Sequence, residues 1–375
     1  MKYSPLPPSS AARRVACPGS KYLEESYRSD ERSPSAFEGE AAHWLAMSLL
    51  TPSPVLHATS PTGEILTQEM YEGAKLWQET VLDTAPSSSQ LHIEERLDIS
   101  FIHPDCWGVP DCWFYDKAQN RLYIFEYKYG RKAIEVFENW QMLEYAAGIL
   151  AGHVITEVSA EVFSSIEVFF VIVQPRAHHN YLGKVREWSV PVNSLDPYFK
   201  VLRETEAEAS SDKAMCRPSP ECNYCAARHV CRALRTTALT ITDSSELNIP
   251  RPLRGEELGT ELRYLQRSAK LLNARITGLE AEAEIRLKKG EVVTNYRLQE
   301  GQGKEVWDAP LEEVKGLGEL FGVDLTKEDL ITPKQAIKAG IPDAEVRQYS
   351  KTYGGSLKLT PVDEGKSKWI FGGNK

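Results

Sequence analysis

Two neighbouring strand patterns constrain the fold most, because the second carries charge where a strand normally buries apolar side chains. Residues 112–116 read CWFYD and residues 121–129 read RLYIFEYKY. The four-residue segment KAQN separates them, which predicts a β-hairpin. Side chains two apart share one face of a strand, so Glu126 and Lys128 lie on the face of Ile124. A carboxylate and an ammonium are costly to bury there unless something binds them.

The hairpin register brings a second carboxylate to the same face. If Asp116 pairs with Arg121, counting back places Asp111 opposite Glu126, with Cβ atoms about 4.5–5.5 Å apart. Two carboxylates this close repel each other unless a proton or a cation lies between them. Oxygen ligands at this spacing suit Mg²⁺ or Mn²⁺, and Lys128 can orient a water or stabilise charge developing on a phosphate. The alternative is an exposed hairpin with an ordinary surface ion pair, which contributes little.

Length and composition are those of a soluble globular protein with room for more than one domain. The 375 residues are 42% hydrophobic and 26% charged, with a formal net charge of −9. We find no apolar stretch near the about 18 residues of a membrane helix and no secretory signal. We therefore expect a cytoplasmic protein whose seven cysteines bind metal or are buried thiols. The negative charge argues against a surface that is basic throughout, but it permits a local basic groove.

Periodicity divides the chain into a mixed α/β region, residues 1–245, and a C-terminal region, residues 250–375. Helical patterns in the first region cover residues 36–50, 69–85 and 131–152. Strand patterns cover residues 91–101, 112–116, 121–129, 166–174 and 186–192.

The C-terminal region begins with a heptad pattern over residues 255–289, which ends before Gly290. Its apolar positions are Leu258, Leu262, Leu265, Ala269, Leu272, Ile276, Leu279 and Ala283. A long helix packed on its own protein and a coiled-coil homo-oligomer both explain this pattern, because three heptads are near the minimum for a coiled coil. The rest of the region predicts a small α+β appendage.

The hairpin residues resemble the core motif of the PD-(D/E)XK nuclease superfamily. Asp111 follows a proline, and the next strand carries Glu126-Tyr127-Lys128. The resemblance implies a restriction-endonuclease-like core, with a central mixed sheet flanked by helices. It further implies that Asp111 and Glu126 bind a catalytic Mg²⁺ or Mn²⁺. The Tyr127 carbonyl is implied as another metal contact, and Lys128 as the catalytic lysine.

Flanking motifs are similar to those of the RecB-like branch of this superfamily. Gln141 and Tyr145 form a QxxxY pair on one helix face, and a GxxxH motif ends at His43. The resemblance implies that His43 binds the metal, while Gln141 and Tyr145 lie near the substrate or support the site. Some members place an additional acidic residue before the aspartate, and here Glu94 and Glu95 both qualify.

A cysteine cluster predicts a second metal site. Cys222, Cys225 and Cys231 have the spacing CxxCxxxxxC, and thiolates so arranged in a cytoplasmic protein usually bind metal. The candidates for a fourth ligand are Cys216, Cys17 and, for zinc, His229. Spacing alone leaves Zn²⁺ and a [4Fe–4S] cluster both open.

Similarity to the iron–sulfur members of the RecB-like branch, including the CRISPR-associated exonucleases, favours the cluster. Those proteins take one cysteine from a CP motif before the nuclease core and three after it. The implied ligands are therefore Cys17, Cys222, Cys225 and Cys231. The cysteines left outside this set are Cys106, Cys112 and Cys216.

These features lead us to expect a metal-dependent DNA nuclease. The whole chain is similar to an uncharacterised phage and prophage family of RecB-like proteins, which implies an exonuclease acting in phage recombination or replication. It also implies a recombination partner such as a single-strand annealing protein. The alternatives are a catalytically silent DNA-end or single-strand binding module and an interaction scaffold built on the heptad helix. Arg131 and Lys132 are candidates for phosphate contacts, or they lie at a solvated helix start.

Overall fold

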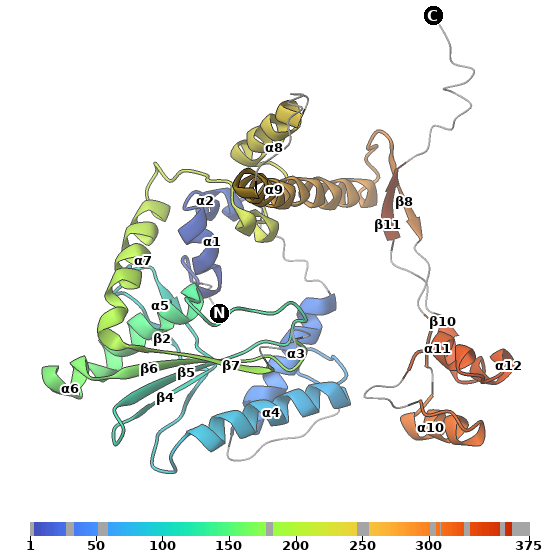
Figure 1. Ribbon diagram of the computed structural model, residues 1–375, viewed down its shortest axis with the longest axis horizontal. Helices are drawn as coiled ribbons and strands as arrows, with labels where there is room; N and C mark the ends of the chain where they lie inside the picture. The colour runs from blue at the N-terminus through green and yellow to red at the C-terminus, as the bar shows by residue number, and fades with distance from the viewer. Residues whose placement is uncertain are drawn as a thin grey trace, which may run out of the picture. The chain divides into compact units, whose positions relative to one another are not determined.

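A five-stranded mixed β-sheet with helices on both faces forms the centre of the computed structural model (Figure 1). This architecture confirms the predicted mixed α/β class. The structure describes residues 4–27, 34–51, 59–177, 183–245, 255–300, 305–307, 309–325, 331–352 and 357–361.

The sheet has the strand order β1-β4-β5-β6-β7, in which β5 and β6 run parallel and the other neighbours run antiparallel. Its strands are β1 (His92–Ile93), β4 (Cys112–Asp116), β5 (Arg121–Tyr127), β6 (Glu167–Val173) and β7 (Val185–Pro191). A separate short ladder joins β2 (Leu97–Asp98) to β3 (Trp107–Gly108). Asp116 pairs with Arg121, as predicted for the hairpin.

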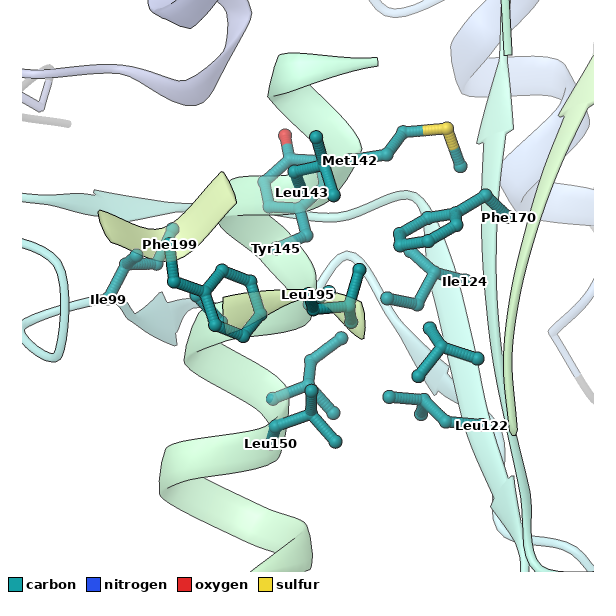
Figure 2. Close-up of a cluster of buried hydrophobic side chains, with 14 of the residues drawn as sticks. Ile99, Leu122, Ile124, Met142, Leu143, Tyr145, Leu150, Phe170, Leu195 and Phe199 are labelled. Carbon is teal, nitrogen blue, oxygen red and sulfur yellow. The ribbon is translucent and has the colours of Figure 1, made fainter. Parts of the chain in front are cut away.

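Helices cover both faces of the sheet, so the central strand β5 is apolar on both sides. Its alternate residues Leu122 and Ile124 face one core, while Phe125 faces the other. The first core is covered by α5 (Trp140–Ile149) and α7 (Asp196–Ala209), and the second by α3 (Pro34–Leu49) and α4 (Gln68–Thr84) (Figure 1). Figure 2 shows Met142 and Leu143 of α5 among the side chains of the first core.

Short helices complete the first region. They are η1 (Pro8–Ser10), α1 (Ala11–Ala16), α2 (Ser20–Glu25), the π-helical turn η2 (Leu150–Val154), α6 (Ala160–Ser164), η3 (Val192–Ser194), η4 (Pro220–Tyr224) and α8 (Arg232–Ser245).

Helix α5 begins later than the helical pattern over residues 131–152 predicts. The Asn139 side chain accepts hydrogen bonds from the backbone N–H groups of Gln141 and Met142, which caps the helix at this point. The preceding segment is held in a non-helical path because the Gln174 side chain binds backbone groups of Lys132 and Ile134. A polar side chain from another strand therefore overrides the local helical pattern.

The long helix α9 (Gly255–Lys288) packs on its own protein through a face other than the heptad seam. Leu271 and Ala274 are buried against the region of Cys222 and Cys231, whereas heptad residues such as Leu262 are more than half exposed. The chain accordingly divides into two compact units, residues 1–276 and 277–375, with the division inside α9. The predicted C-terminal region, residues 250–375, contains the whole helix, and residues 246–254 lie outside the described residues.

Beyond the end of α9, the described part of the second unit contains three further helices and two antiparallel strand pairs around a small apolar core that includes Val314, Ala336 and Val346. Its helices are α10 (Leu311–Leu320), α11 (Pro333–Lys338) and α12 (Asp343–Val346). Its strand pairs are β8 (Tyr296–Glu300) with β11 (Leu357–Pro361), and β9 (Glu305–Trp307) with β10 (Ser350–Thr352). Across the described part of the chain, we find no helix with the length and apolar character needed to cross a membrane.

Candidate metal centre and cysteine site

The buried Asp111 lies immediately before β4, at the end of the hairpin ladder. The last pair of that ladder is Cys112 with Phe125, so the next step along the strands places Asp111 opposite Glu126. The Asp111 Oδ2 atom accepts a hydrogen bond of 2.6 Å from the Tyr127 backbone N–H. The hairpin backbone thereby fixes the orientation of the Asp111 carboxylate.

His43 reaches this carboxylate from helix α3. Its Nε2 lies 2.8 Å from Asp111 Oδ1, and its Nδ1 lies 3.6 Å from Glu94 Oε1. Burial disfavours a charged imidazole, but the carboxylates of Asp111, Glu94 and Glu126 outweigh burial and raise the pKa of His43 to about 9. A protonated His43 therefore balances part of the negative charge of this site.

Glu126 is buried, with 4% of its surface exposed, and its two oxygens have different surroundings. Oε1 lies 2.6 Å from Lys128 Nζ and accepts a 2.7 Å hydrogen bond from Gln141 Nε2. Oε2 is buried and has no hydrogen-bond partner among the described residues. Burial and the nearby Asp111 carboxylate raise the pKa of Glu126 to about 6, although Lys128 opposes this shift.

Two residues of α5 complete a hydrogen-bonded chain beneath the carboxylates. Gln141 Oε1 accepts from Lys128 Nζ at 3.3 Å, and Gln141 Nε2 also donates to the Tyr145 hydroxyl at 3.2 Å. The Tyr145 hydroxyl donates to the Val109 carbonyl at 3.1 Å. The Tyr145 ring belongs to the first core (Figure 2). A Cβ at Gly108 would lie only 2.8 Å from this ring, so glycine permits the close packing.

The structure places Glu94, and not Glu95, beside His43 and the candidate metal ligands. Strand β1 pairs with β4, and the Glu94 backbone N–H donates to the Asp111 carbonyl at 3.2 Å. Glu94 has a φ of 48°, in the left-handed region, which turns the chain away from the sheet. Glu95 Oε2 instead lies 2.7 Å from Nδ1 of His92.

The donor set fits a hard divalent cation, because carboxylate oxygens and an imidazole nitrogen converge and one buried oxygen of Glu126 is unpartnered. Most of the other oxygens that could bind a metal are already in hydrogen bonds or ion pairs. Asp111 contacts His43 and the Tyr127 N–H, while Glu126 Oε1 contacts Lys128. Within the described ranges, no three His, Cys, Asp or Glu side chains, at this site or among the cysteines, are already arranged to hold a metal ion. Metal binding requires His43 to lose its proton and Lys128 to turn aside.

A second cluster joins the beginning of the chain to its cysteine-rich segment. Its five cysteines line one small cavity and are Cys17, Cys216, Cys222, Cys225 and Cys231. Backbone N–H groups donate to the sulfurs of three of the four cysteines that the resemblance implies as ligands. These donors are Arg217 to Cys17, Ser219 to Cys222 and Leu234 to Cys231. Such N–H donors stabilise thiolates, so the chemistry of these sulfurs suits a metal or cluster.

Cys216 lies in this cavity although the sequence analysis left it outside the ligand set. Burial, followed by the neighbouring thiols of Cys17 and Cys231, raises the pKa of Cys216 to about 12. The available sequence signal was its position six residues before Cys222. Cys106 and Cys112 are buried in the two separate cores.

A buried ion cluster anchors the segment that carries Cys17. The Arg14 guanidinium of α1 contacts Glu206 of α7 at 2.7 Å and Glu144 of α5 at 3.1 Å. Both glutamates are fully buried. Burial raises the pKa of Glu144 well above its usual value, which Arg14 opposes and Glu206 reinforces. Burial therefore favours the protonated form of Glu144, while the Glu206 carboxylate pairs with the arginine.

The comparisons with known proteins place the chain in a family without assigning an activity. The solved structure titled "Crystal structure of SSO0001" is 14% identical, with a TM-score of 0.31, and the match covers 62% of this chain and 88% of that chain. Neither match names a nuclease, so the resemblance to RecB-like nucleases stays a prediction. Residues 3–345 match the family described as "Protein of unknown function (DUF2800)", and the chain belongs to that family.

Proposed function

We propose that this protein is a Mg²⁺- or Mn²⁺-dependent deoxyribonuclease, an exonuclease that processes DNA ends in phage recombination or replication. The observation that carries the proposal is the meeting of two buried carboxylates, Asp111 and Glu126, beside Lys128. One oxygen of Glu126 has no partner among the described residues. Burying this much charge at one edge of a hairpin is costly unless a ligand uses it.

The side chains divide into metal ligands and substrate-facing groups. His43, Asp111 and Glu126 would hold the cation, with the Tyr127 carbonyl as a further contact. A bound divalent cation supplies a lowered pKa for water and charge neutralisation at the scissile phosphate.

The other groups act on the substrate or on the ligands. Lys128, released from Glu126, stabilises negative charge that develops on the phosphate or orients the attacking water. Gln141 donates to Glu126 and keeps its carboxylate turned toward the site. Tyr145 fixes Gln141 in turn, because their side chains are hydrogen-bonded.

The cysteine site has a structural role in this proposal. Cys17, Cys222, Cys225 and Cys231 hold a [4Fe–4S] cluster, or Zn²⁺ as the alternative, which joins the two ends of the nuclease region. Backbone N–H donors to three of these sulfurs support the assignment.

The decisive experiment incubates anaerobically purified protein with linear end-labelled DNA and Mn²⁺, beside an Asp111→Ala variant. We expect the wild type to degrade the DNA and the variant to lose at least about a thousandfold in rate, because removing a catalytic ligand typically costs several kcal/mol of transition-state stabilisation. The order of the products gives the digestion polarity.

Equal inertness of both proteins on single- and double-stranded DNA, with the metal content of the cysteine site intact, would exclude the nuclease. A salt titration of DNA binding by a Lys128→Ala variant would then test the binding-module alternative, in which this lysine contributes little.

A further inference from the structure

An exposed tyrosine lies in the cysteine site and contacts the loop that follows the catalytic strand. Tyr224 stands between Cys222 and Cys225, and 52% of its surface is exposed. The Lys132 ammonium lies 4.6 Å from the centre of the Tyr224 ring and donates a hydrogen bond to its hydroxyl. The contact thus joins the cysteine site to the loop that follows β5, the strand that carries Glu126.

Both partners stand on fixed backbone. The Tyr224 carbonyl accepts a 3.0 Å hydrogen bond from the Arg13 guanidinium. The Lys132 carbonyl accepts a 2.8 Å bond from Gln174, whose side chain is fully buried and in turn accepts a 2.6 Å bond from Arg186. An aromatic ring on a rigid support loses little entropy when it binds a ligand.

The pair is close to the metal centre along the chain. Lys132 is four residues after Lys128, and four residues of extended chain span at most about 14 Å. A polymer bound at Tyr224 can therefore reach the carboxylates within a short stretch of its own backbone.

We propose that Tyr224 is a stacking platform for a base of single-stranded DNA, with Lys132 releasing the tyrosine to contact the adjacent phosphate. This inference rests on the proposed nuclease function and names its substrate as a single strand. Only unstacked bases offer a free face to an aromatic ring, so a duplex gains nothing from Tyr224. Stacking contributes about 1–3 kcal/mol per base to the binding free energy, and the contact of the lysine with a phosphate adds a contribution that depends on salt concentration.

The chain contains a matched control. Tyr22 of α2 is 44% exposed, and Lys21 Nζ lies 4.7 Å from its ring centre. The Tyr22 hydroxyl donates to the Ser210 carbonyl, away from the loop that follows Lys128. Tyr22 therefore has the same chemistry as Tyr224 without the link to the metal centre.

The test measures fluorescence anisotropy of labelled (dT)20 and of a 20-base-pair duplex with the full chain, purified anaerobically in the Asp111→Ala background. We expect Tyr224→Ala to weaken (dT)20 binding about tenfold, while Tyr224→Phe and Tyr22→Ala stay within about twofold and duplex binding is unchanged. We expect Lys132→Ala to lower the slope of the logarithm of the (dT)20 binding constant against the logarithm of salt concentration by about 0.7. Iron content checks that the cysteine site is intact in each variant.

Three outcomes would overturn the proposed stacking role of Tyr224. They are equal (dT)20 affinity in the wild type and Tyr224→Ala, an equal loss of affinity for the duplex, and no (dT)20 binding at all. If Tyr224→Ala loses iron, the test is the salt dependence of (dT)20 binding by Lys132→Ala. A salt dependence equal to that of the wild type overturns the proposal. Cleavage by the protein that retains Asp111 is read separately. DNA cleavage with no effect of Tyr224→Ala on (dT)20 binding would contradict only the stacking role of Tyr224. An effect of Tyr224→Ala on (dT)20 binding with no DNA cleavage would contradict only the nuclease proposal.

Discussion

Arg14 faces two buried glutamates, and the charges of this cluster do not balance without a proton. One Glu144 oxygen has no hydrogen-bond partner among the described residues, and burial raises the pKa of Glu144. The folded state therefore keeps a proton at pH values where an unfolded glutamate has released it. The unfolding free energy must then fall as the pH rises above the ordinary glutamate pKa.

Glu144→Gln should remove this pH dependence, because a neutral amide replaces the protonated carboxyl. We expect the wild-type unfolding free energy to fall as the pH rises above the ordinary glutamate pKa, with this group contributing at most about 1.4 kcal/mol per pH unit, and the variant to show a flatter curve. Urea unfolding at several pH values measures both. Glu204→Gln on α7, the helix that carries Glu206, changes an exposed side chain and should retain the wild-type slope. A variant curve parallel to the wild type would show that Glu144 ionises normally.

At the scale of residues, the sequence predicts which site residues meet when local hairpin geometry brings them together. It does not predict site residues whose position depends on pairing between strands that are distant in the chain. Counting along one hairpin was enough to bring Asp111, Glu126 and Lys128 together. The choice of Glu94 over Glu95 depends on the pairing of β1 with β4 and on a left-handed backbone at Glu94. No local pattern encodes either, because β1 and β4 meet only in the folded sheet.

At the scale of elements, α5 shows how one polar residue sets the start of a helix. Its apolar pattern continues upstream of Trp140, but the Asn139 cap and the Gln174 contacts make the helix begin at Trp140. This boundary matters because Gln141 occupies the first turn of α5 and contacts Glu126.

Asn139→Ala should destabilise the fold by about 1 kcal/mol, because two backbone N–H groups lose their acceptor. Urea unfolding measures the change. Asn139→Asp retains the acceptor oxygen and should recover most of the loss. Equal destabilisation by both substitutions would mean that the Asn139 Nδ2 donor to the Glu135 carbonyl, and not the cap, stabilises this turn.

The long helix α9 shows that apolar periodicity identifies a helix without identifying its packed face. The heptad pattern predicts the helix, yet Leu271 and Ala274 outside the seam are the residues that are buried. The partner surface is formed by the cysteine-rich segment, whose shape depends on contacts with the N-terminus.

At the scale of the whole molecule, the cysteine site joins segments from both ends of the first unit. If the four predicted ligands hold the metal, Cys222→Ser should lose iron and acid-labile sulfide, while Cys216→Ser in the same cavity should keep them. A cross-link over so long a loop contributes about 2–5 kcal/mol, so Cys222→Ser should unfold roughly 5–15 °C lower. Iron analysis and thermal unfolding measure both effects. Equal iron loss in Cys216→Ser would add Cys216 to the ligands.

The same arrangement has a consequence for biosynthesis. The Arg217 N–H that binds the Cys17 sulfur follows it by 200 residues, and ribosomes add about 5–20 residues per second. Helix α1 therefore leaves the ribosome about 10–40 s before the chain that completes its sulfur site. During that interval Arg14 also lacks Glu206 of α7. The first segment to be synthesised is thus among the last to reach its final place, and any metal that the proposed site takes up binds at the end of folding.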